Sequence, residues 1–272
     1  MSNSFSDFIS ASLGEASNIA KEKFGKVSGV TKEGDNNQVL TEADTAIGKR
    51  LIELVEKAYP EHSIIDEEAG VIDKKSEYTW VIDPIDGTSN FANAVPTYGV
   101  MLGLLQNNIP VAGGVALPAF SEIYSAEKGK GAFCNGALIR VTNESRLLST
   151  LVAYIIDGHQ ENPSLTRQEA GIIGEIVLNI RNLRASGSVF DIMMVAKGNY
   201  GGFLCNTSKI WDNVAPQIII EEAGGIYTDF EGEPIDYSSP VKRVNENYTV
   251  CTAPSALHQE LQKIIKQQMK SN

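Results

Sequence analysis

The chain has 272 residues, which is long enough for one large or two small domains with a substantial core. Its contents of 42% hydrophobic and 21% charged residues are ordinary for a soluble globular protein. The formal net charge of −11 argues against nonspecific nucleic-acid binding, which needs a basic surface, and against attraction to anionic membranes.

Cysteine usage and the first residues bear on the compartment. Cys134, Cys205 and Cys251 lie far apart without CxxC spacing, so no zinc site is expected, and a small odd number suits a reducing compartment. Residues 1–5 lack the basic and apolar regions of a signal peptide, and no run of about 18 apolar residues occurs. We therefore expect a cytoplasmic protein with no direct nucleic-acid partner and no membrane partner.

The chain begins with two helical patterns. Apolar residues at helical spacing predict a helix over residues 4–25. A second helix begins at Thr41, where Asp44 completes a capping box, and Pro60 ends it. The polar, glycine-containing residues 28–38 between these helices indicate a mobile loop.

Strand patterns follow. Residues 62–65 predict a strand that ends in the acidic residues 66–68, and residues 79–82 predict a short buried strand. Residues 97–126 alternate apolar runs with turn residues, which predicts a β-meander with turns near 107 and 119, and residues 129–136 indicate a turn and another strand.

The second half of the chain interleaves helices and strands. It predicts strands over 151–156, 226–230 and 248–252, and helices over 165–178, 186–198, 214–223 and 255–268. This interleaving favours a layered α/β fold, while the consecutive hairpins of residues 97–126 argue against a purely parallel sheet.

The most informative stretch is Trp80–Phe91, with the sequence WVIDPIDGTSNF. Residues 83–86 fit a type I turn, because Asp is favoured at its first position and Pro at its second. Such a turn brings its end Cα atoms within about 7 Å, so Asp83 and Asp86 can reach one point. Two carboxylates held this close repel unless a proton or a cation lies between them, and Mg²⁺ prefers such oxygen ligands.

The three residues that follow, Gly87, Thr88 and Ser89, offer backbone N–H groups at an expected helix start, which is a ready anion site. A metal site beside an anion site indicates phosphate chemistry. The alternative is a capped strand–turn–helix without chemistry, since Asp and Ser are ordinary turn and cap residues.

Acidic residues gather in three places where strands end or helices begin: residues 66–68, the pair Asp83 and Asp86, and Asp212. Paired metal ions about 3.5–4 Å apart need several oxygen ligands, which these positions can supply. Structural alternatives remain at single positions: Asp212 can be an N-cap, Glu67 can lie in a solvated loop, and Asp44 can serve only its capping box.

The chain resembles the inositol monophosphatase family of Mg²⁺-dependent, lithium-sensitive sugar-phosphate phosphatases. The matching segments are residues 62–68, 80–91, 129–136, 187–188, 211–212 and 222–225. The resemblance implies an α/β fold in the form of a five-layer αβαβα sandwich. It also implies a homodimer and a single catalytic unit over residues 1–272, with a metal-binding half of about 1–140 and a second half of about 141–272.

The resemblance also implies a site with two or three Mg²⁺ ions. Glu67, Asp83 and the carbonyl of Ile85 match the first metal site, and Asp83, Asp86 and Asp212 match the second. Glu67 matches a third, looser site through water.

Other residues match catalytic and substrate-binding positions. Thr88, with Glu67, would orient the attacking water, and Thr41 and Asp44 match positions near that water. The phosphate- and substrate-binding positions implied are Asp86, Gly87, Thr88, Ser89, Gly187, Ser188, Cys205 and Asp212.

Four residues depart from the family pattern. Asp66 and Pro216 stand where glycine is common, and Pro216 is expected within the first turn of its helix, where proline is tolerated. Cys205 stands where inositol-specific members carry a glutamate that binds substrate hydroxyls, and Val189 replaces a small residue of the substrate pocket. These two changes leave the substrate open.

The expected function is therefore Mg²⁺-dependent hydrolysis of a phosphate monoester of a small polyol, sugar or related metabolite. The alternatives within the superfamily are fructose-1,6-bisphosphatase, histidinol-phosphatase and 3′-phosphoadenosine 5′-phosphate phosphatase activity. An alternative of another class is a regulatory binding partner in a transcription complex, because some bacterial relatives take part in such complexes.

Overall fold

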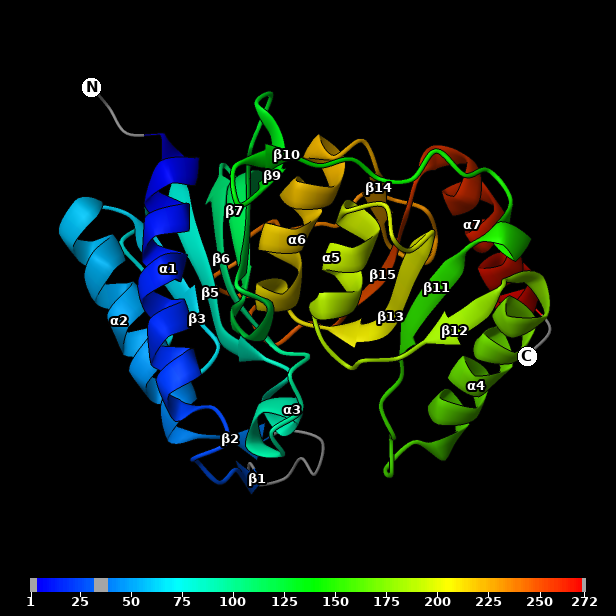
Figure 1. The fold of residues 1–272 in the computed structure, drawn as a ribbon, viewed down its shortest axis with the longest axis horizontal. Coiled ribbons are helices and arrows are strands. Elements are labelled where there is room, and N and C mark those ends of the chain that lie inside the picture. The colour runs from blue at the N-terminus through cyan, green and yellow to red at the C-terminus, as the bar shows by residue number, and fades with distance from the viewer. Residues whose placement is uncertain (1–3, 32–38, 271–272) are drawn as a thin grey trace.

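The structure, a computed structural model, describes residues 4–31 and 39–270 and is built of five layers (Figure 1). Across Figure 1 these are a helix pair, an eight-stranded sheet, a second helix pair, a five-stranded sheet and a third helix pair. The pairs are α1 (Phe5–Lys23) with α2 (Glu42–Ala58), α5 (Phe190–Ala196) with α6 (Ile210–Glu222), and α4 (Pro163–Asn179) with α7 (Ser255–Lys270). The five-layer αβαβα sandwich expected from the sequence is confirmed.

The eight-stranded sheet forms most of the first half of the chain. Its spatial order is β10 (Ala137–Leu138), β9 (Gly131–Cys134), β8 (Glu122–Glu127), β7 (Ile109–Leu117), β6 (Gly99–Gln106), β5 (Tyr78–Asp86), β3 (Ser63–Asp66) and β4 (Gly70–Ile72). The β3–β5 pair is parallel and the other described neighbours are antiparallel. The predicted meander of β6, β7 and β8 is confirmed. Helices cover both faces of this sheet, so β5 and β6 read as continuous apolar runs.

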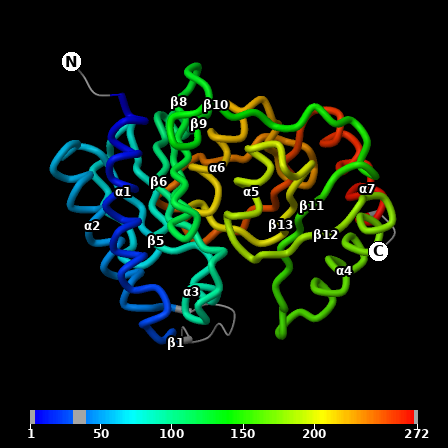
Figure 2. The backbone as a smooth tube through the Cα atoms, viewed as in Figure 1, coloured from blue at the N-terminus to red at the C-terminus, as the bar shows by residue number. Residues whose placement is uncertain are grey.

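The five-stranded sheet belongs to the second half. Its order is β12 (Asn182–Arg184), β11 (Leu151–Ile155), β13 (Gly202–Ser208), β15 (Tyr248–Ala253) and β14 (Ile226–Thr228). The first three strands run parallel, and β15 is antiparallel to both of its neighbours. Figure 2 shows α1 and α7 at opposite ends of the long axis, with this sheet on the α7 side.

Two short pieces complete the fold. β1 (Val30–Thr31) pairs with β2 (Val39–Leu40), and α3 (Thr88–Ala92) follows β5. The predicted loop over residues 28–38 contains β1, and its residues 32–38 lie outside the described residues. The capping box at the start of α2 is present as predicted, with Thr41 as the N-cap and Asp44 as its partner.

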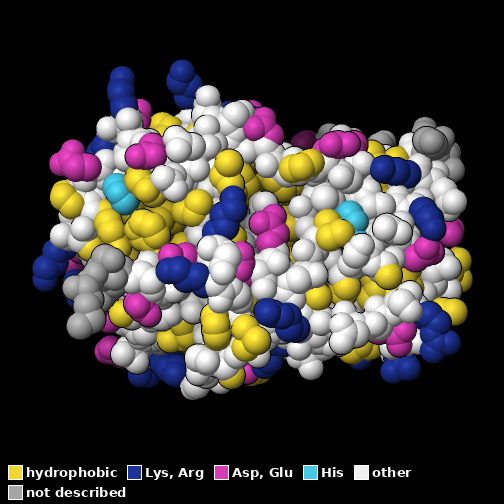
Figure 3. All heavy atoms as spheres, turned by 90° about the horizontal axis from the view of Figure 1, so that it is seen from above, with side chains coloured by type: hydrophobic (Ala, Val, Ile, Leu, Met, Phe, Trp, Pro, Cys, Tyr) yellow, Lys and Arg dark blue, Asp and Glu magenta, His cyan; other side chains and the backbone are white. Residues whose placement is uncertain are grey.

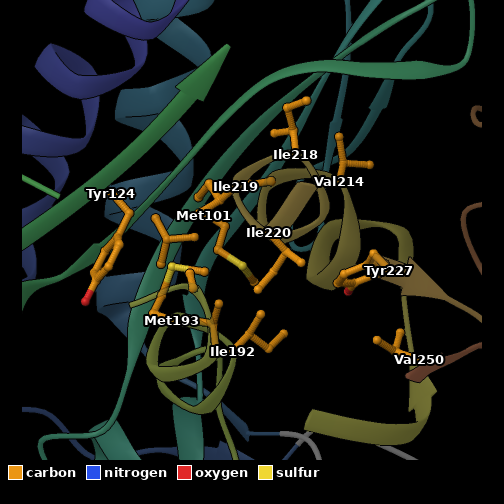
Figure 4. Close-up of a cluster of buried hydrophobic side chains, with 14 of the residues drawn as sticks. Met101, Tyr124, Ile192, Met193, Val214, Ile218, Ile219, Ile220, Tyr227 and Val250 are labelled. Atoms are coloured by element: carbon orange, nitrogen blue, oxygen red, sulfur yellow. The ribbon is translucent and has the colours of Figure 1, made fainter. Parts of the chain in front are cut away.

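The central helix α6 touches the eight-stranded sheet closely. A Cβ built on Gly103 of β6 would lie 2.7 Å from Val214, and one built on Gly113 of β7 would lie 2.7 Å from Ile218. These contacts belong to a buried cluster of hydrophobic residues from both halves of the chain. Figure 4 shows part of it, including Met101 from the first half and Ile192 from the second. The close packing of α6 against Gly103 and Gly113 fixes the distance between this helix and the sheet.

The structure corrects the expected turn at residues 83–86. These residues continue β5, where Asp83 pairs with Met101 and Asp86 with Gly99 of β6. The turn prediction is wrong because the ladder to β6 keeps the backbone extended. Between these two pairs, Pro84 and Ile85 of β5 oppose the single residue Val100 of β6, which is a β-bulge, and a missing N–H is tolerated at Pro84 there.

The start of α6 is also corrected. The helix begins at Ile210, with Lys209 as its N-cap, so Asp212 lies inside the first turn instead of capping it. Pro216 is therefore the seventh residue of α6, and its expected place in the first turn is wrong. Its missing N–H leaves the Asp212 carbonyl without its helical donor.

Two surface properties bear on partners. Among the described residues, none of the helices is both long and apolar enough to cross a bilayer. On the face drawn in Figure 3, Lys and Arg side chains lie scattered among acidic ones and form no continuous basic patch.

Candidate active site

Three carboxylates converge where β5 meets the first turn of α6. Oxygen atoms of Asp83, Asp86 and Asp212 all lie within 4.8 Å of one another. Asp83 is 1% exposed, and the other two are half-buried. The structure thus brings together residues from the two halves of the chain.

The β-bulge explains how Asp83 and Asp86 share one point. Residues three apart in a regular strand point to opposite faces of the sheet. The extra residue between Asp83 and Asp86 changes that alternation, so both side chains reach the same side as Asp212.

The electrostatics of this triad favour the binding of a cation. Burial, together with the charges of Glu67 and Asp86, raises the pKa of Asp83 well above its usual range. Burial also raises the pKa of Asp86 and of Asp212 to about 7. Three ionised carboxylates this close need a cation between them, and hard divalent ions take such oxygen ligands.

The donor set fits a metal ion. The Oδ1 atom of Asp83 is buried and has no hydrogen-bond partner among the described residues. One oxygen of Asp86 accepts the backbone N–H of Val189, and Asp212 Oδ2 accepts that of Lys209 over 2.5 Å. These bonds orient Asp86 and Asp212 while leaving acceptor capacity for a cation.

Glu67 lies beside the triad, directly after β3. Its backbone N–H donates to the Ile82 carbonyl of β5 over 3.2 Å, and its charge contributes to the raised pKa values of Asp83 and Asp86. Asp66 shapes the turn that carries it, because Asp66 Oδ1 accepts the N–H groups of Glu68 and Ala69 over 2.9 and 2.7 Å. The departure at Asp66 therefore has a structural use.

A chain of hydrogen bonds joins α2 to α3 next to the triad. The Thr41 hydroxyl donates to Asp44 Oδ2 over 2.6 Å, and the Thr88 hydroxyl lies 3.2 Å from Asp44 Oδ1 and 2.8 Å from the Ile85 carbonyl oxygen. Asp44 is 1% exposed, and burial raises its pKa. The structure thus brings Thr41, Asp44, Ile85 and Thr88 together.

Gly87 and the 186–189 segment form the opposite wall. Gly87 is the N-cap of α3 with φ +78°, and a Cβ there would lie 2.9 Å from the Ser188 Cβ. Thr88 and Ser89 open α3, so their N–H groups have no intrahelical acceptor. Gly187, with φ +71°, adjoins the same wall.

Asn90 is a functional candidate that sequence reasoning missed. Its amide donates to the carbonyl of Ser186 over 2.8 Å and to that of Thr97 over 2.7 Å. This side chain therefore ties the DPIDGTSN motif to the second half of the chain. Its place within that motif was the available signal.

A cavity of about 180 Å³ adjoins the triad. Asp86, Asp212, Gly187, Ser188, Val189 and Cys205 are among its lining residues. Cys205 is buried, its thiol lies 3.1 Å from the Thr207 carbonyl oxygen, and burial raises its pKa well above the usual range. Asp157 and Thr207 also line the cavity and were missed, because neither belongs to a motif and β13 was not predicted.

Comparisons with known proteins agree with this geometry. The model of the inositol monophosphatase family matches residues 3–270. A fructose-1,6-bisphosphatase/inositol-1-monophosphatase of Aquifex aeolicus is 34% identical over 227 residues, covering 81% of this chain and 83% of that protein. A Nus factor SuhB of Pasteurella multocida is 33% identical over 198 residues, covering 72% and 73%. The solved Thermotoga maritima IMPase superposes with a TM-score of 0.84 at 27% identity, covering 97% of this chain and 98% of that one.

Proposed function

The chain belongs to the inositol monophosphatase family and is a phosphoric monoester hydrolase, and we propose that it is a Mg²⁺-dependent phosphatase acting on a small phosphorylated polyol, sugar or related metabolite. The observation that carries this proposal is the convergence of Asp83, Asp86 and Asp212 within 4.8 Å, next to a cavity of about 180 Å³.

The residues that would hold two or three Mg²⁺ ions are Glu67, Asp83, Asp86, Asp212 and, through its carbonyl oxygen, Ile85. The unpartnered Oδ1 of Asp83 and the raised pKa values of Asp86 and Asp212 support this assignment. Bound there, Mg²⁺ supplies positive charge to phosphate oxygens and lowers the pKa of water.

Thr88 and Asp44 are positioned to handle the proton of the attacking water. The Thr88 hydroxyl has one proton, which it donates to Asp44 Oδ1 or to the Ile85 carbonyl oxygen, and it can accept a hydrogen bond from water. Because burial raises its pKa, Asp44 is a stronger proton acceptor than an exposed carboxylate. Thr41 holds the other oxygen of Asp44 in place. Glu67 would orient the same water from the β3 side.

The phosphate would lie against the start of α3. The N–H groups of Gly87, Thr88 and Ser89 lie at the start of α3 and have no acceptor within the helix. They can therefore donate to phosphate oxygens. Ser188 packs on Gly87 and closes this wall from the other half of the chain. The nucleophile is water, so no covalent phosphoenzyme is proposed.

The test is phosphate release from a panel of small phosphate esters with Mg²⁺ and with EDTA. We expect activity only with the metal. The rate of phosphate release should fall at least about a hundredfold in Asp83→Asn and in Asp212→Asn, since each substitution removes a charge from the triad. Asp73→Asn is the matched control, because Asp73 is exposed and does not belong to the triad. Wild-type rates in both triad variants would overturn the assignment.

A second function is favoured by one observation, the name Nus factor SuhB carried by the Pasteurella multocida relative. We propose that this chain also has a partner role in a transcription complex, independent of catalysis. Co-purification with RNA polymerase that survives Asp86→Asn would support it. Equal recovery of polymerase with an unrelated acidic protein would exclude it.

A further inference from the structure

The cavity beside the triad carries a second acidic position, at the ends of β11 and β13. Asp157 and Thr207 line the cavity together with Asp86 and Asp212. β11 and β13 are parallel, and Ile155 pairs with Cys205, so Asp157 and Thr207 continue this register two residues further on. The Thr207 hydroxyl donates to Asp157 Oδ2 over 2.9 Å. This bond fixes the Asp157 carboxylate, which keeps acceptor capacity for a ligand.

Buried polar residues stand behind this position. Asn206, next to Thr207, donates to Glu169 Oε1 of α4 over 2.5 Å. Glu169 is 1% exposed, and its Oε2 atom has no hydrogen-bond partner among the described residues. His159 Nε2 lies 3.5 Å from Glu169 Oε1. The cavity wall is therefore backed by a second carboxylate.

Cys205 lies within the field of both acidic groups. Its pKa is raised first by burial, and also by the charges of Asp212, Asp157 and Glu169. The thiol itself is occupied near the Thr207 carbonyl, at 3.1 Å. The polar recognition capacity in this part of the cavity thus resides in Asp157, not in Cys205.

The charges of the lining select the kind of ligand. The residues that line the cavity include Asp86, Asp157 and Asp212 and contain neither Lys nor Arg. The nearby Lys209 ammonium donates to the Asn245 carbonyl over 2.7 Å. Metal ions would neutralise Asp86 and Asp212 but not Asp157. A second phosphate there meets a like charge, whereas a hydroxyl or ammonium group finds an acceptor.

We propose that Asp157, aligned by Thr207, is a specificity-determining residue that accepts a hydrogen bond from a hydroxyl or ammonium group on the carbon skeleton of a phosphate monoester. The cavity then disfavours a skeleton with a second phosphate. The cavity of about 180 Å³ can hold the carbon skeleton of a small polyol or amino alcohol. This inference rests on the phosphatase function proposed above.

The experiment measures kcat/KM of the Mg²⁺-loaded enzyme for four esters. Inositol 1-phosphate and ethanolamine phosphate carry hydroxyl and ammonium donors, fructose 1,6-bisphosphate carries a second phosphate, and p-nitrophenyl phosphate carries none of these groups. Each value is divided by that for p-nitrophenyl phosphate, so that general damage to the catalytic site cancels.

In Asp157→Asn we expect this ratio to fall at least about tenfold for one or both donor-bearing esters, because the charged hydrogen-bond acceptor becomes a neutral, weaker one. The kcat/KM for the bisphosphate relative to that for inositol 1-phosphate should rise, since both esters carry hydroxyl groups and only the bisphosphate loses a repulsion. Thr207→Val should change the ratios in the same direction but less. Glu161→Gln, an exposed acidic residue four positions from Asp157, is the matched control and should leave every ratio unchanged.

The two levels of the proposal fail differently. Unchanged ratios in Asp157→Asn would overturn this inference but not the proposed function. The same holds if the wild type prefers the bisphosphate and Asp157→Asn does not strengthen that preference. Absence of phosphate release from all four esters would instead overturn the proposed function. If Asp157→Asn melts at a much lower temperature, Thr207→Val carries the same comparison on its own.

Discussion

Ser188 lies so close to Gly87 that a Cβ on the glycine would stand 2.9 Å from the serine Cβ. Gly87 ends the DPIDG run of β5, and Ser188 precedes α5 in the other half of the chain. The contact therefore sets the distance between the expected phosphate-binding turn and the wall of the cavity.

Gly87→Ala should for this reason lose most activity. The residue has φ +78°, so alanine adds backbone strain of about 1–3 kcal/mol, and the Cβ also pushes Ser188 away. The matched control is Gly129→Ala, which has the same φ of +78° but no atom within 4 Å of the added Cβ. The melting temperature should fall in both variants, and further in Gly87→Ala because of the added contact. The kcat/KM for phosphate release should fall strongly only in Gly87→Ala. Equal activity in both would show that the contact is unimportant.

Asp83→Asn should stabilise the metal-free protein while removing its activity. In the absence of a cation, the Asp83 carboxylate is buried beside Glu67, Asp86 and Asp212, which raises its pKa well above the usual range. A neutral amide removes this repulsion. Thermal melting in EDTA should give a higher midpoint for the variant than for the wild type, and Mg²⁺ should raise only the wild-type midpoint. A lower variant midpoint in EDTA would contradict the repulsion.

The stabilisation by Mg²⁺ should grow with pH. The pKa values of Asp86 and Asp212 are about 7 in the folded metal-free protein, whereas Asp in an unfolded chain titrates near 3.9. Between these values the folded state binds more protons, so the metal-free free energy of unfolding falls as pH rises through about 7. Protons also compete with the metal for these oxygens.

The measurement is the difference in melting temperature with and without Mg²⁺ at pH 5.5, 6.5 and 7.5. The difference cancels the pH-dependent contributions of groups outside the site to the melting temperature. One such group is His258, whose pKa is lowered chiefly by burial. A shift that is constant or that shrinks with rising pH is the result that this prediction cannot accommodate.

Thr88→Val should lower kcat much more than it changes KM. The valine keeps the shape but removes the hydroxyl that lies 3.2 Å from Asp44 Oδ1 and 2.8 Å from the Ile85 carbonyl. Loss of positioned proton transfer costs about 10²–10⁴-fold in general. Thr88→Ser retains the hydroxyl and is the conservative control, expected within about tenfold of the wild type. Steady-state kinetics on p-nitrophenyl phosphate distinguish the two, and comparable loss in both would remove the hydroxyl from the mechanism.

Much of the fold could be predicted from sequence because its signals are local. The helices over α1, α2 and α7 show apolar residues at helical spacing, and the capping box at Thr41 and Asp44 is read directly. β13 escaped prediction because it begins at Gly202, directly after Gly201, and such a glycine pair is typical of a turn; its apolar run is also short.

The candidate site was predicted unevenly for a similar reason. The proximity of Asp83 and Asp86 was predicted from a type I turn, whereas the backbone achieves it with a β-bulge. The position of Asp212 beside Asp83 and Asp86 depends on the packing of α6, which no local sequence pattern encodes. Asp212 was included in the predicted site because of the family resemblance. Asp157 is fixed only by the register of β11 against β13, which sequence alone does not specify.

The placement of α6 has a thermodynamic consequence. Asp86 and Asp212 are 126 positions apart in the sequence. Asp86 belongs to β5 of the eight-stranded sheet, and Asp212 belongs to α6 in the second half of the chain. A divalent ion shared between them would act as a reversible crosslink, closing a loop of that length. Occupancy by the ion and docking of the two halves would then be coupled, so that amide hydrogens of α6 exchange more slowly when the metal is bound.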